Sequence, residues 1–154
     1  MNYLKTFLFL LFVPGSVVFL IPYQIMRRSA SRWKLNFGYL RHTAWLSWAG
    51  GAALLLWSFW NFARRGRGTP HPIDPPKVLV VEGPYRFTRN PQYIGVMLIL
   101  LGHILWSGAL VLLGYGSLIF ILFNIFVQYY EEPNLEQRFR ESYRRYREQV
   151  PRWL

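Results

Sequence analysis

Four apolar segments alternate with polar stretches along the chain. They cover residues 4–23, 40–62, 91–106 and 109–130. At about 1.5 Å of rise per residue, an apolar helix of about 20 residues crosses the roughly 30 Å hydrocarbon core of a bilayer. The pattern therefore predicts about four transmembrane helices. A secretory signal is the alternative for the first segment, but the apolar run continues past Pro14 and Gly15 without a small-residue cleavage site.

Only Ser107 and Gly108 separate the third segment from the fourth. So short a connection predicts an antiparallel helical hairpin. In such a hairpin the start of the third segment lies level with the end of the fourth. We therefore expect the acidic pair Glu131 and Glu132, which follows the fourth segment, to face the loop that precedes the third.

That loop combines residues that restrict the backbone with residues that relax it. Pro84 and Pro91 fix φ, whereas Gly83 widens the range that φ can take. The backbone between them can thus hold a fixed non-helical path and present arginine and asparagine side chains to one place. Non-helical backbone near a membrane must be buried in protein or line a polar cavity, and we expect a cavity here.

The C-terminal segment predicts an amphipathic helix. Apolar residues recur at helical spacing, while arginines fill most of the positions between them. The apolar stripe consists of Leu135, Phe139, Tyr143, Tyr146 and Val150. We expect this helix to lie on the membrane surface, where its arginines attract anionic lipid and its stripe covers the pocket.

The composition supports this picture. The chain has 154 residues, 53% of them apolar, with 18 Lys and Arg against 7 Asp and Glu and a net charge of +11. Its length allows one domain, with two transmembrane helices in 1–62 and the loop, hairpin and C-terminal helix in 63–154. The apolar fraction excludes a disordered chain, and arginines placed between apolar runs argue against a nucleic-acid partner. The sequence therefore predicts an all-α integral membrane protein.

Several kinds of chemistry have no residues to support them. Cysteine is absent, so the chain has no thiolate metal site and no cysteine nucleophile. His42, His71 and His103 are isolated, so their spacing assembles neither a zinc site nor a hydrolase triad. We interpret His103, which lies near the predicted hairpin turn, as structural. We expect no metal.

The basic residues also predict an orientation. With four spans, most of the Lys and Arg fall on the side that holds the loop and the C-terminal segment. The opposite side carries Arg27, Arg28, Arg32, Lys34 and Arg41. The positive-inside rule then predicts a multi-pass protein whose active face lies in the cytosol.

Three motifs occur in a fixed order in the second half of the chain. They read Gly83-Pro84-Tyr85-Arg86 with Arg89-Asn90-Pro91-Gln92-Tyr93-x-Gly95, then Glu131-Glu132-Pro133-x-Leu135, then Tyr143-x-x-Tyr146-x-x-x-Val150-Pro151-Arg152-Trp153. This set resembles the isoprenylcysteine carboxyl methyltransferase family of integral membrane enzymes and, more broadly, the membrane phospholipid methyltransferases. The resemblance covers about residues 75–154. It implies a helical membrane bundle whose cytosolic face binds S-adenosylmethionine.

The resemblance implies a set of cofactor contacts. They are Gly83, Pro84, Tyr85, Arg89, Asn90, Pro91, Tyr93, Gly95, Glu131, Glu132, Tyr143 and Tyr146. S-adenosylmethionine presents an ammonium, a carboxylate, ribose hydroxyls and a flat adenine. Its pocket therefore needs carboxylates, a fixed cation and an aromatic wall. The family's usual histidine is Asn90 here, and an amide cannot titrate near neutral pH.

We expect Arg89 and Glu132 to be the catalytic residues, and we expect substrate contacts from Arg86, Asn124, Gln128 and Trp153. The alternative interpretation is that the two glutamates are merely solvated. On that interpretation Arg86 and Arg89 are anchors at the membrane interface.

The predicted function is S-adenosylmethionine-dependent methyl transfer to a lipophilic acceptor, foremost carboxyl O-methylation of an isoprenylcysteine-like substrate. The alternatives are N-methylation of a phospholipid or another amine, and a non-enzymatic membrane adaptor that keeps the fold. The expected partners are a lipophilic small molecule or prenylated substrate and membrane lipids. The sequence leaves the oligomeric state open.

Overall fold

The computed structural model describes residues 15–28, 34–65 and 78–154. These ranges are helical apart from short connections and contain no strand, although an isolated antiparallel bridge joins Lys34 to Ala109. The elements are η1 (Ser16–Leu20), α2 (Ile21–Arg28), η2 (Gly38–Thr43), α3 (Ala44–Arg65), η3 (Gly83–Arg86), α4 (Pro91–Ser107), α5 (Leu110–Phe126), η4 (Val127–Glu131) and α6 (Glu132–Gln149). The all-α prediction is confirmed for this part of the chain. The part of the first apolar segment before residue 15 lies outside it.

The chain divides into two compact units. Unit 1 comprises Met1–Ala52 and Gly95–Leu118, and unit 2 comprises Ala53–Ile94 and Ile119–Leu154. Each of the helices α3, α4 and α5 contributes residues to both units. The contacts described below lie within one unit or the other, and the single domain stays a prediction.

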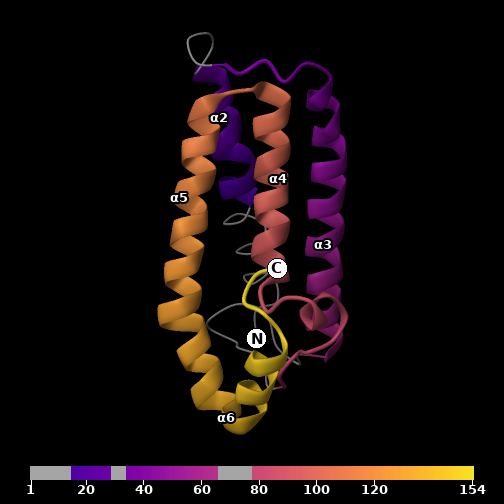
Figure 1. The fold of residues 1–154 in the computed structure, drawn as a ribbon, viewed down its shortest axis with the longest axis vertical. Coiled ribbons are helices and arrows are strands. Elements are labelled where there is room, and N and C mark those ends of the chain that lie inside the picture. The colour runs from indigo at the N-terminus through magenta and orange to yellow at the C-terminus, as the bar shows by residue number, and fades with distance from the viewer. Residues whose placement is uncertain (1–14, 29–33, 66–77) are drawn as a thin grey trace, which may run out of the picture. The chain divides into compact units, whose positions relative to one another are not determined.

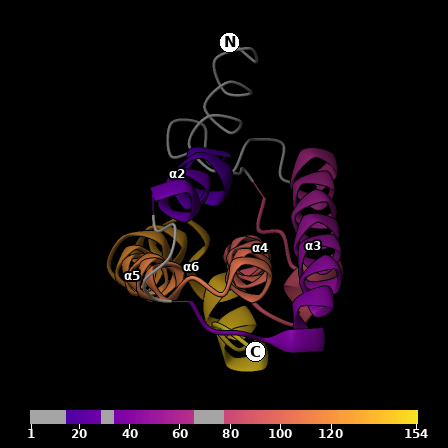
Figure 2. The ribbon, with the colours of Figure 1, turned by 90° about the horizontal axis from the view of Figure 1, so that it is seen from above.

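In unit 1, α4 lies between α3 and α5 (Figure 1, Figure 2). Glycines allow α3 and α4 to approach closely. A Cβ added at Gly51 of α3 would lie 2.7 Å from the carbonyl oxygen of Gly95, and one added at Gly102 of α4 would collide with the indole of Trp48. Small residues at helix contacts are typical of packing in membranes, where close backbone approach replaces the hydrophobic driving force.

His103 has partners for both of its ring nitrogens. The Trp48 Nε1–H group donates to His103 Nδ1 at 3.2 Å, so the ring proton resides on Nε2, which lies 2.9 Å from the Val18 carbonyl oxygen. The Tyr115 hydroxyl donates to the neighbouring Val17 carbonyl at 2.9 Å. Both valines belong to η1, a π-helix. These contacts agree with the structural role expected of His103.

The turn between α4 and α5 forms where the sequence predicts it. Gly108 has φ +66°, and its amide donates to the Ile104 carbonyl at 2.8 Å, as in a helix C-cap. Its carbonyl accepts the Leu35 amide at 2.8 Å, and a Cβ at Gly108 would collide with the Leu35 backbone. Glycine is therefore required both for the backbone conformation and for the close approach.

The surface of α5 is apolar and exposed. Among the residues described, one helical stretch, Leu110–Gln149, contains a segment long and apolar enough to cross a membrane, and α4 is apolar but shorter. Exposed apolar side chains on α5 are Val111, Leu113, Leu118, Phe120, Ile121, Leu122, Ile125 and Phe126. So large an apolar surface is typical of a helix that contacts lipid. The structure thus supports one span, fewer than the four that the sequence predicts.

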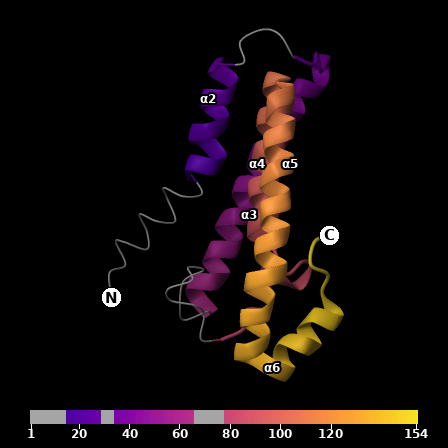
Figure 3. The ribbon, with the colours of Figure 1, turned by 90° about the vertical axis from the view of Figure 1, so that its left-hand side faces the viewer.

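In unit 2, the chain leaves α5 through the π-helix η4 and turns back along α6 (Figure 3). Tyr143, Tyr146 and Val150 form a buried cluster to which Leu79, Leu135 and Phe139 add their side chains. The predicted apolar stripe is therefore confirmed, and it packs on Leu79 of the loop. One feature departs from a regular amphipathic helix, because Arg140 has φ 44° and ψ −117° and kinks α6.

Candidate functional site

The loop before α4 takes its shape from Gly83 and Pro84. Gly83 has φ +63°, and Pro84 occupies the first turn of the 3-10 helix η3. A Cβ at Gly83 would lie 2.5 Å from the side-chain nitrogen of Asn61, which belongs to α3. The turn therefore lies directly against α3 and leads the chain into Tyr85 and Pro84, both of which are buried.

Replacing Gly83 with alanine should strain this loop. An L-residue in the left-handed region costs about 1–2 kcal/mol, and the Asn61 side chain must also move. We expect a thermal midpoint several degrees below that of the wild type. Gly50→Ala is the control, because nothing lies within 4 Å of a Cβ at that position. Equal midpoints for the two variants would contradict the strained turn.

Three charged side chains from distant parts of the sequence meet at the end of this loop. Arg89 Nη1 lies 2.9 Å from Glu132 Oε1, and Arg152 contacts both carboxylate oxygens of Glu132 at 2.8 Å through Nε and Nη2. The side chains of Arg89 and Glu132 are only 10% and 11% exposed. The hydrogen bond to Glu132 raises the pKa of the Arg152 guanidinium above its usual range. Buried charges persist when they are paired in this way.

The last residues of the chain bind the loop through their backbone. The Arg152 carbonyl accepts hydrogen bonds from Thr88 Oγ1 at 3.0 Å and from Asn90 Nδ2 at 2.9 Å. The Pro151 carbonyl accepts the Arg89 amide at 3.0 Å. The side-chain amide of Asn90 is thus used to hold the C-terminal segment, a role that needs no titratable group.

Glu131 contacts the first turn of α4. The Tyr93 hydroxyl donates to Glu131 Oε2 at 2.8 Å, and the Tyr93 ring lies 4.6 Å from that of Phe123. Burial raises the pKa of the Glu131 carboxyl, and this effect outweighs the hydrogen bond from Tyr93. The acidic pair therefore faces the loop and the start of α4, as the hairpin predicts, but its two members have different partners.

Three tyrosines line the inner side of α6 and the loop. The Tyr143 hydroxyl accepts a hydrogen bond from Arg89 Nη1 at 3.2 Å, and the Tyr146 hydroxyl donates to the Tyr85 carbonyl at 2.7 Å. Burial is the main cause that raises the pKa of the Tyr85 phenol, with Glu131 contributing next. Burial also raises the pKa of the Tyr143 and Tyr146 phenols, so all three stay protonated at neutral pH.

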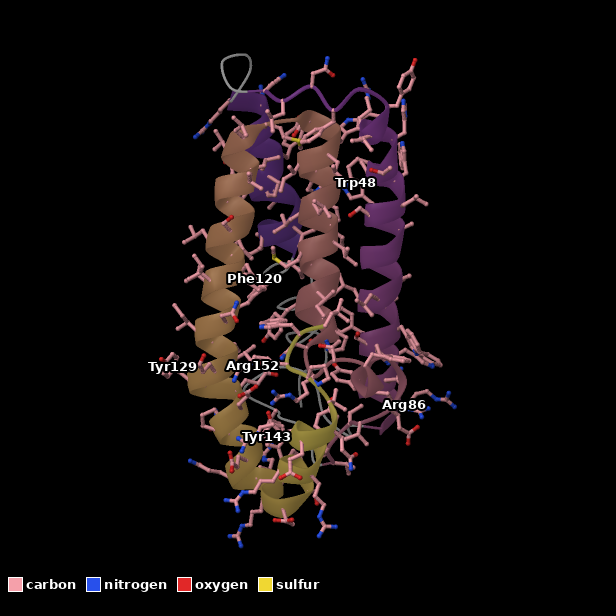
Figure 4. The ribbon with its side chains drawn as sticks, in the orientation of Figure 1. Trp48, Arg86, Phe120, Tyr129, Tyr143 and Arg152 are labelled. Carbon is pink, nitrogen blue, oxygen red and sulfur yellow. The ribbon has the colours of Figure 1, made fainter. Side chains whose placement is uncertain are left out.

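The residues expected to bind substrate divide into two groups. The Trp153 indole donates to Asn124 Oδ1 at 3.0 Å, and Arg152 Nη1 lies 3.5 Å from Gln128 Oε1, at the limit of a hydrogen bond. Arg86 is exposed and points away from this cluster, whereas Arg152 and Tyr143 point into it (Figure 4). The structure therefore brings Asn124, Gln128 and Trp153 together and leaves Arg86 outside.

Most of the residues expected to bind the cofactor lie in unit 2. Pro91 begins α4 and is fully buried beside Asn90. Gly95 belongs to unit 1, where its carbonyl approaches Gly51, so it is not part of the cluster just described.

Two residues of the cluster, Thr88 and Arg152, were not among the expected site residues. Thr88 is buried and bonds the Arg152 carbonyl, and Arg152 holds Glu132. The signal for Arg152 was its position between Pro151 and Trp153 in the third motif. No periodic pattern marks Thr88.

Two buried side-chain nitrogens in the described ranges have no hydrogen-bond partner. They are Arg89 Nε and Gln92 Nε2. A buried donor without a partner costs free energy, so such donors suit a ligand that brings an acceptor. Together with the Glu131 carboxylate and the rings of Tyr93, Phe123 and Trp153, they provide the donors, the acceptor and the aromatic wall that S-adenosylmethionine needs. Glu132 fits less directly, since both of its oxygens already bind arginines.

Comparison with known proteins identifies the family of the chain. Residues 40–142 match the family model described as phospholipid methyltransferase. An uncharacterised protein of Haemophilus influenzae is 46% identical over 64 residues, which cover 41% of this chain and the whole length of that protein. No solved structure matches the chain. Since the family model covers η3, the hairpin, the acidic pair and most of α6, the chain belongs to the phospholipid methyltransferase family.

Proposed function

We propose that this chain is an S-adenosylmethionine-dependent methyltransferase that lies in the membrane and acts on a lipophilic acceptor. The observation that carries the proposal is the buried Arg89, whose Nη1 group is fixed by Glu132 and Tyr143 while its Nε–H group has no partner. A fixed guanidinium with a free donor suits the carboxylate of the cofactor. Family membership independently supports methyl transfer.

The residues around Arg89 would hold the cofactor in place. When bound, S-adenosylmethionine supplies an electrophilic methyl group on a positively charged sulfur. Arg89 and Gln92 would donate to its carboxylate, and Glu131 would accept from its ammonium or ribose hydroxyls. Tyr93 and Trp153 would cover the adenine. Holding the two reactants in line and excluding water supplies much of the rate enhancement in such a displacement.

A carboxylate is the acceptor that we propose first, as in an isoprenylcysteine-like substrate. A carboxylate is already a nucleophile at neutral pH, so its methylation needs no proton acceptor. Asn124, Gln128 and Trp153 would line its path.

N-methylation of a phospholipid or another amine is the second candidate. Two observations favour it: the name of the matched family, and a half-buried Glu131 carboxyl whose pKa is raised by desolvation. An amine must lose a proton during methylation, and a carboxylate with a raised pKa suits that task.

The proposed topology is multi-pass with the site on the cytosolic face. The exposed apolar surface of α5 and the apolar character of α4 support a membrane environment. The basic loop and C-terminal segment, which the positive-inside rule assigns to the cytosol, carry the candidate site.

Cofactor binding is the first test. Isothermal titration of detergent-purified protein with S-adenosylhomocysteine should show one site per chain. If millimolar ligand produces no binding heat and causes no thermal stabilisation, the enzyme proposal is wrong, and a non-enzymatic adaptor that keeps the fold replaces it.

The class of acceptor can be read from the product. Membranes that contain the protein should transfer labelled methyl from S-adenosylmethionine into a lipid extract. A carboxyl acceptor predicts a methyl ester, whose label is released by mild base. Label that survives base treatment and co-migrates with an N-methylated lipid would instead establish the second candidate.

A further inference from the structure

Arg152 does more in the candidate site than attach the C-terminal segment to the loop. Its backbone carbonyl already holds the segment to the loop through Thr88 and Asn90. Its guanidinium is used separately, in a two-pronged contact with Glu132 at 2.8 Å. The backbone and the side chain of one residue thus have different partners, so the two functions can be separated by mutation.

The guanidinium of Arg152 changes the charge of the cluster. Arg89 and Glu132 alone would form a neutral pair. With Arg152 sharing the same carboxylate, two positive charges face one negative charge, and the cluster retains an excess of positive charge. Within the described residues, Glu131 forms no ion pair with either arginine, and its carboxylate accepts a hydrogen bond from the neutral Tyr93 hydroxyl at 2.8 Å.

The excess charge lies beside a donor that is ready for a ligand. Arg89 Nε is buried and has no partner, while Nη1 of the same guanidinium is held by Glu132 and Tyr143. If the Arg152 guanidinium were removed, the whole negative charge of the Glu132 carboxylate would act on Arg89 and neutralise it. The attraction of Arg89 for an anionic group would then fall, even though Arg89 itself is intact.

We propose that Arg152 is a positioning residue for the carboxylate of the cofactor's amino-acid moiety, and that it acts through Glu132: by sharing that carboxylate it prevents Glu132 from fully neutralising the Arg89 guanidinium, which stays able to bind an anionic group. This inference rests on the proposed function, since it assumes that S-adenosylmethionine is the cofactor. It assigns Arg152 no contact with the cofactor.

The test compares two ligands. S-adenosylhomocysteine carries the amino-acid carboxylate, whereas 5′-methylthioadenosine keeps the adenosine and the thioether but lacks that carboxylate. Arg152→Ala should weaken S-adenosylhomocysteine by about tenfold or more in isothermal titration, the size of one lost charged interaction. It should leave the affinity for 5′-methylthioadenosine unchanged. Arg152→Lys, which keeps the charge but not the two-pronged contact, should recover part of the loss.

Arg147→Ala is the matched control. Arg147 lies on α6, the helix that also carries Glu132 and Tyr143. Its side chain is exposed, however, and pairs with Glu136 on the surface. Its loss changes the net charge by the same amount. Affinity for both ligands should match that of the wild type.

Hydrogen exchange shows whether the C-terminal segment stays in place. The Arg89 amide donates to the Pro151 carbonyl, so slow exchange at Arg89 reports the attachment of the segment. We expect Arg152→Ala to keep this protection. If protection is lost and both ligands weaken equally, Arg152 is only a structural tie and the inference is wrong. If the wild type binds neither ligand, the proposed function fails and the inference falls with it.

Discussion

Glu132→Gln should abolish binding of S-adenosylhomocysteine and lower the thermal midpoint by many degrees. The carboxylate of Glu132 is the shared partner of Arg89 and Arg152, and its side chain is only 11% exposed. An amide of the same shape leaves two guanidiniums without a counter-charge, so they repel each other and Arg89 loses the contact that fixes its position in the site. Breaking a buried ion pair by removing one partner costs about 3–5 kcal/mol. Titration calorimetry and thermal unfolding in the same detergent measure the two effects.

Glu136→Gln is the matched control for this variant. Glu136 also pairs with two arginines, Arg144 and Arg147, but all three side chains lie at the surface of α6. Surface ion pairs contribute little to stability because water screens them. We expect ligand affinity and midpoint close to those of the wild type. A Glu132→Gln variant that behaves like this control would show that Glu132 is merely solvated.

Arg89→Ala should also abolish binding of S-adenosylhomocysteine, but with a smaller loss of stability. The substitution removes the buried guanidinium whose Nε–H group is unpaired. Glu132 still keeps Arg152 as a two-pronged partner, so no buried charge is left alone. The order of midpoints should therefore be wild type, then Arg89→Ala, then Glu132→Gln.

Arg145→Ala tests whether the loss of ligand binding in Arg89→Ala is specific to that position. Arg145 pairs with Glu141 on the exposed side of α6, so its removal changes the net charge equally without touching the cluster. Arg89→Lys adds a second comparison, since lysine keeps the charge but loses the planar fork. If Arg89→Ala still binds S-adenosylhomocysteine with the affinity of the wild type, Arg89 is not part of the cofactor site and is only an anchor at the membrane interface.

Much of the fold follows from patterns that are local in the sequence. Apolar runs of sufficient length predict α3, α4 and α5, and the two residues Ser107 and Gly108 predict the turn. These patterns predict the number of transmembrane helices less well. The structure supports one clear span, because α4 is apolar but shorter and much of the first segment lies outside the described ranges.

The part of the candidate site that depends on the hairpin was predicted from the sequence. Antiparallel packing brings the acidic pair to the loop, and Glu132 indeed contacts Arg89. The partner of Glu131 is Tyr93, which lies in α4 itself rather than in the loop. The hairpin sets which ends meet, but long side chains and local changes in helical geometry select the individual partners.

The return of the chain end could not be predicted from periodicity. The contacts of Arg152 with Glu132 and of its carbonyl with Thr88 depend on how α6 turns back, and that path includes a kink at Arg140. An amphipathic pattern shows which face of a helix is buried. It carries no information about the direction in which a helix leaves the preceding one, so it could not predict the partners of Arg152.

The π-helix η4 ends directly before Glu132, at the junction between the apolar helix and the site. Each residue of an α-helix turns the chain by roughly 100°, whereas a π turn accommodates one extra residue. The rotation of Glu132 about the helix axis is therefore set by the number of residues in η4, and not by the identity of those residues. Substitutions in η4 can change the lining of the site gradually, but loss or gain of a single residue would turn the carboxylate away from both arginines at once. Relatives that keep this site should consequently agree in the length of η4.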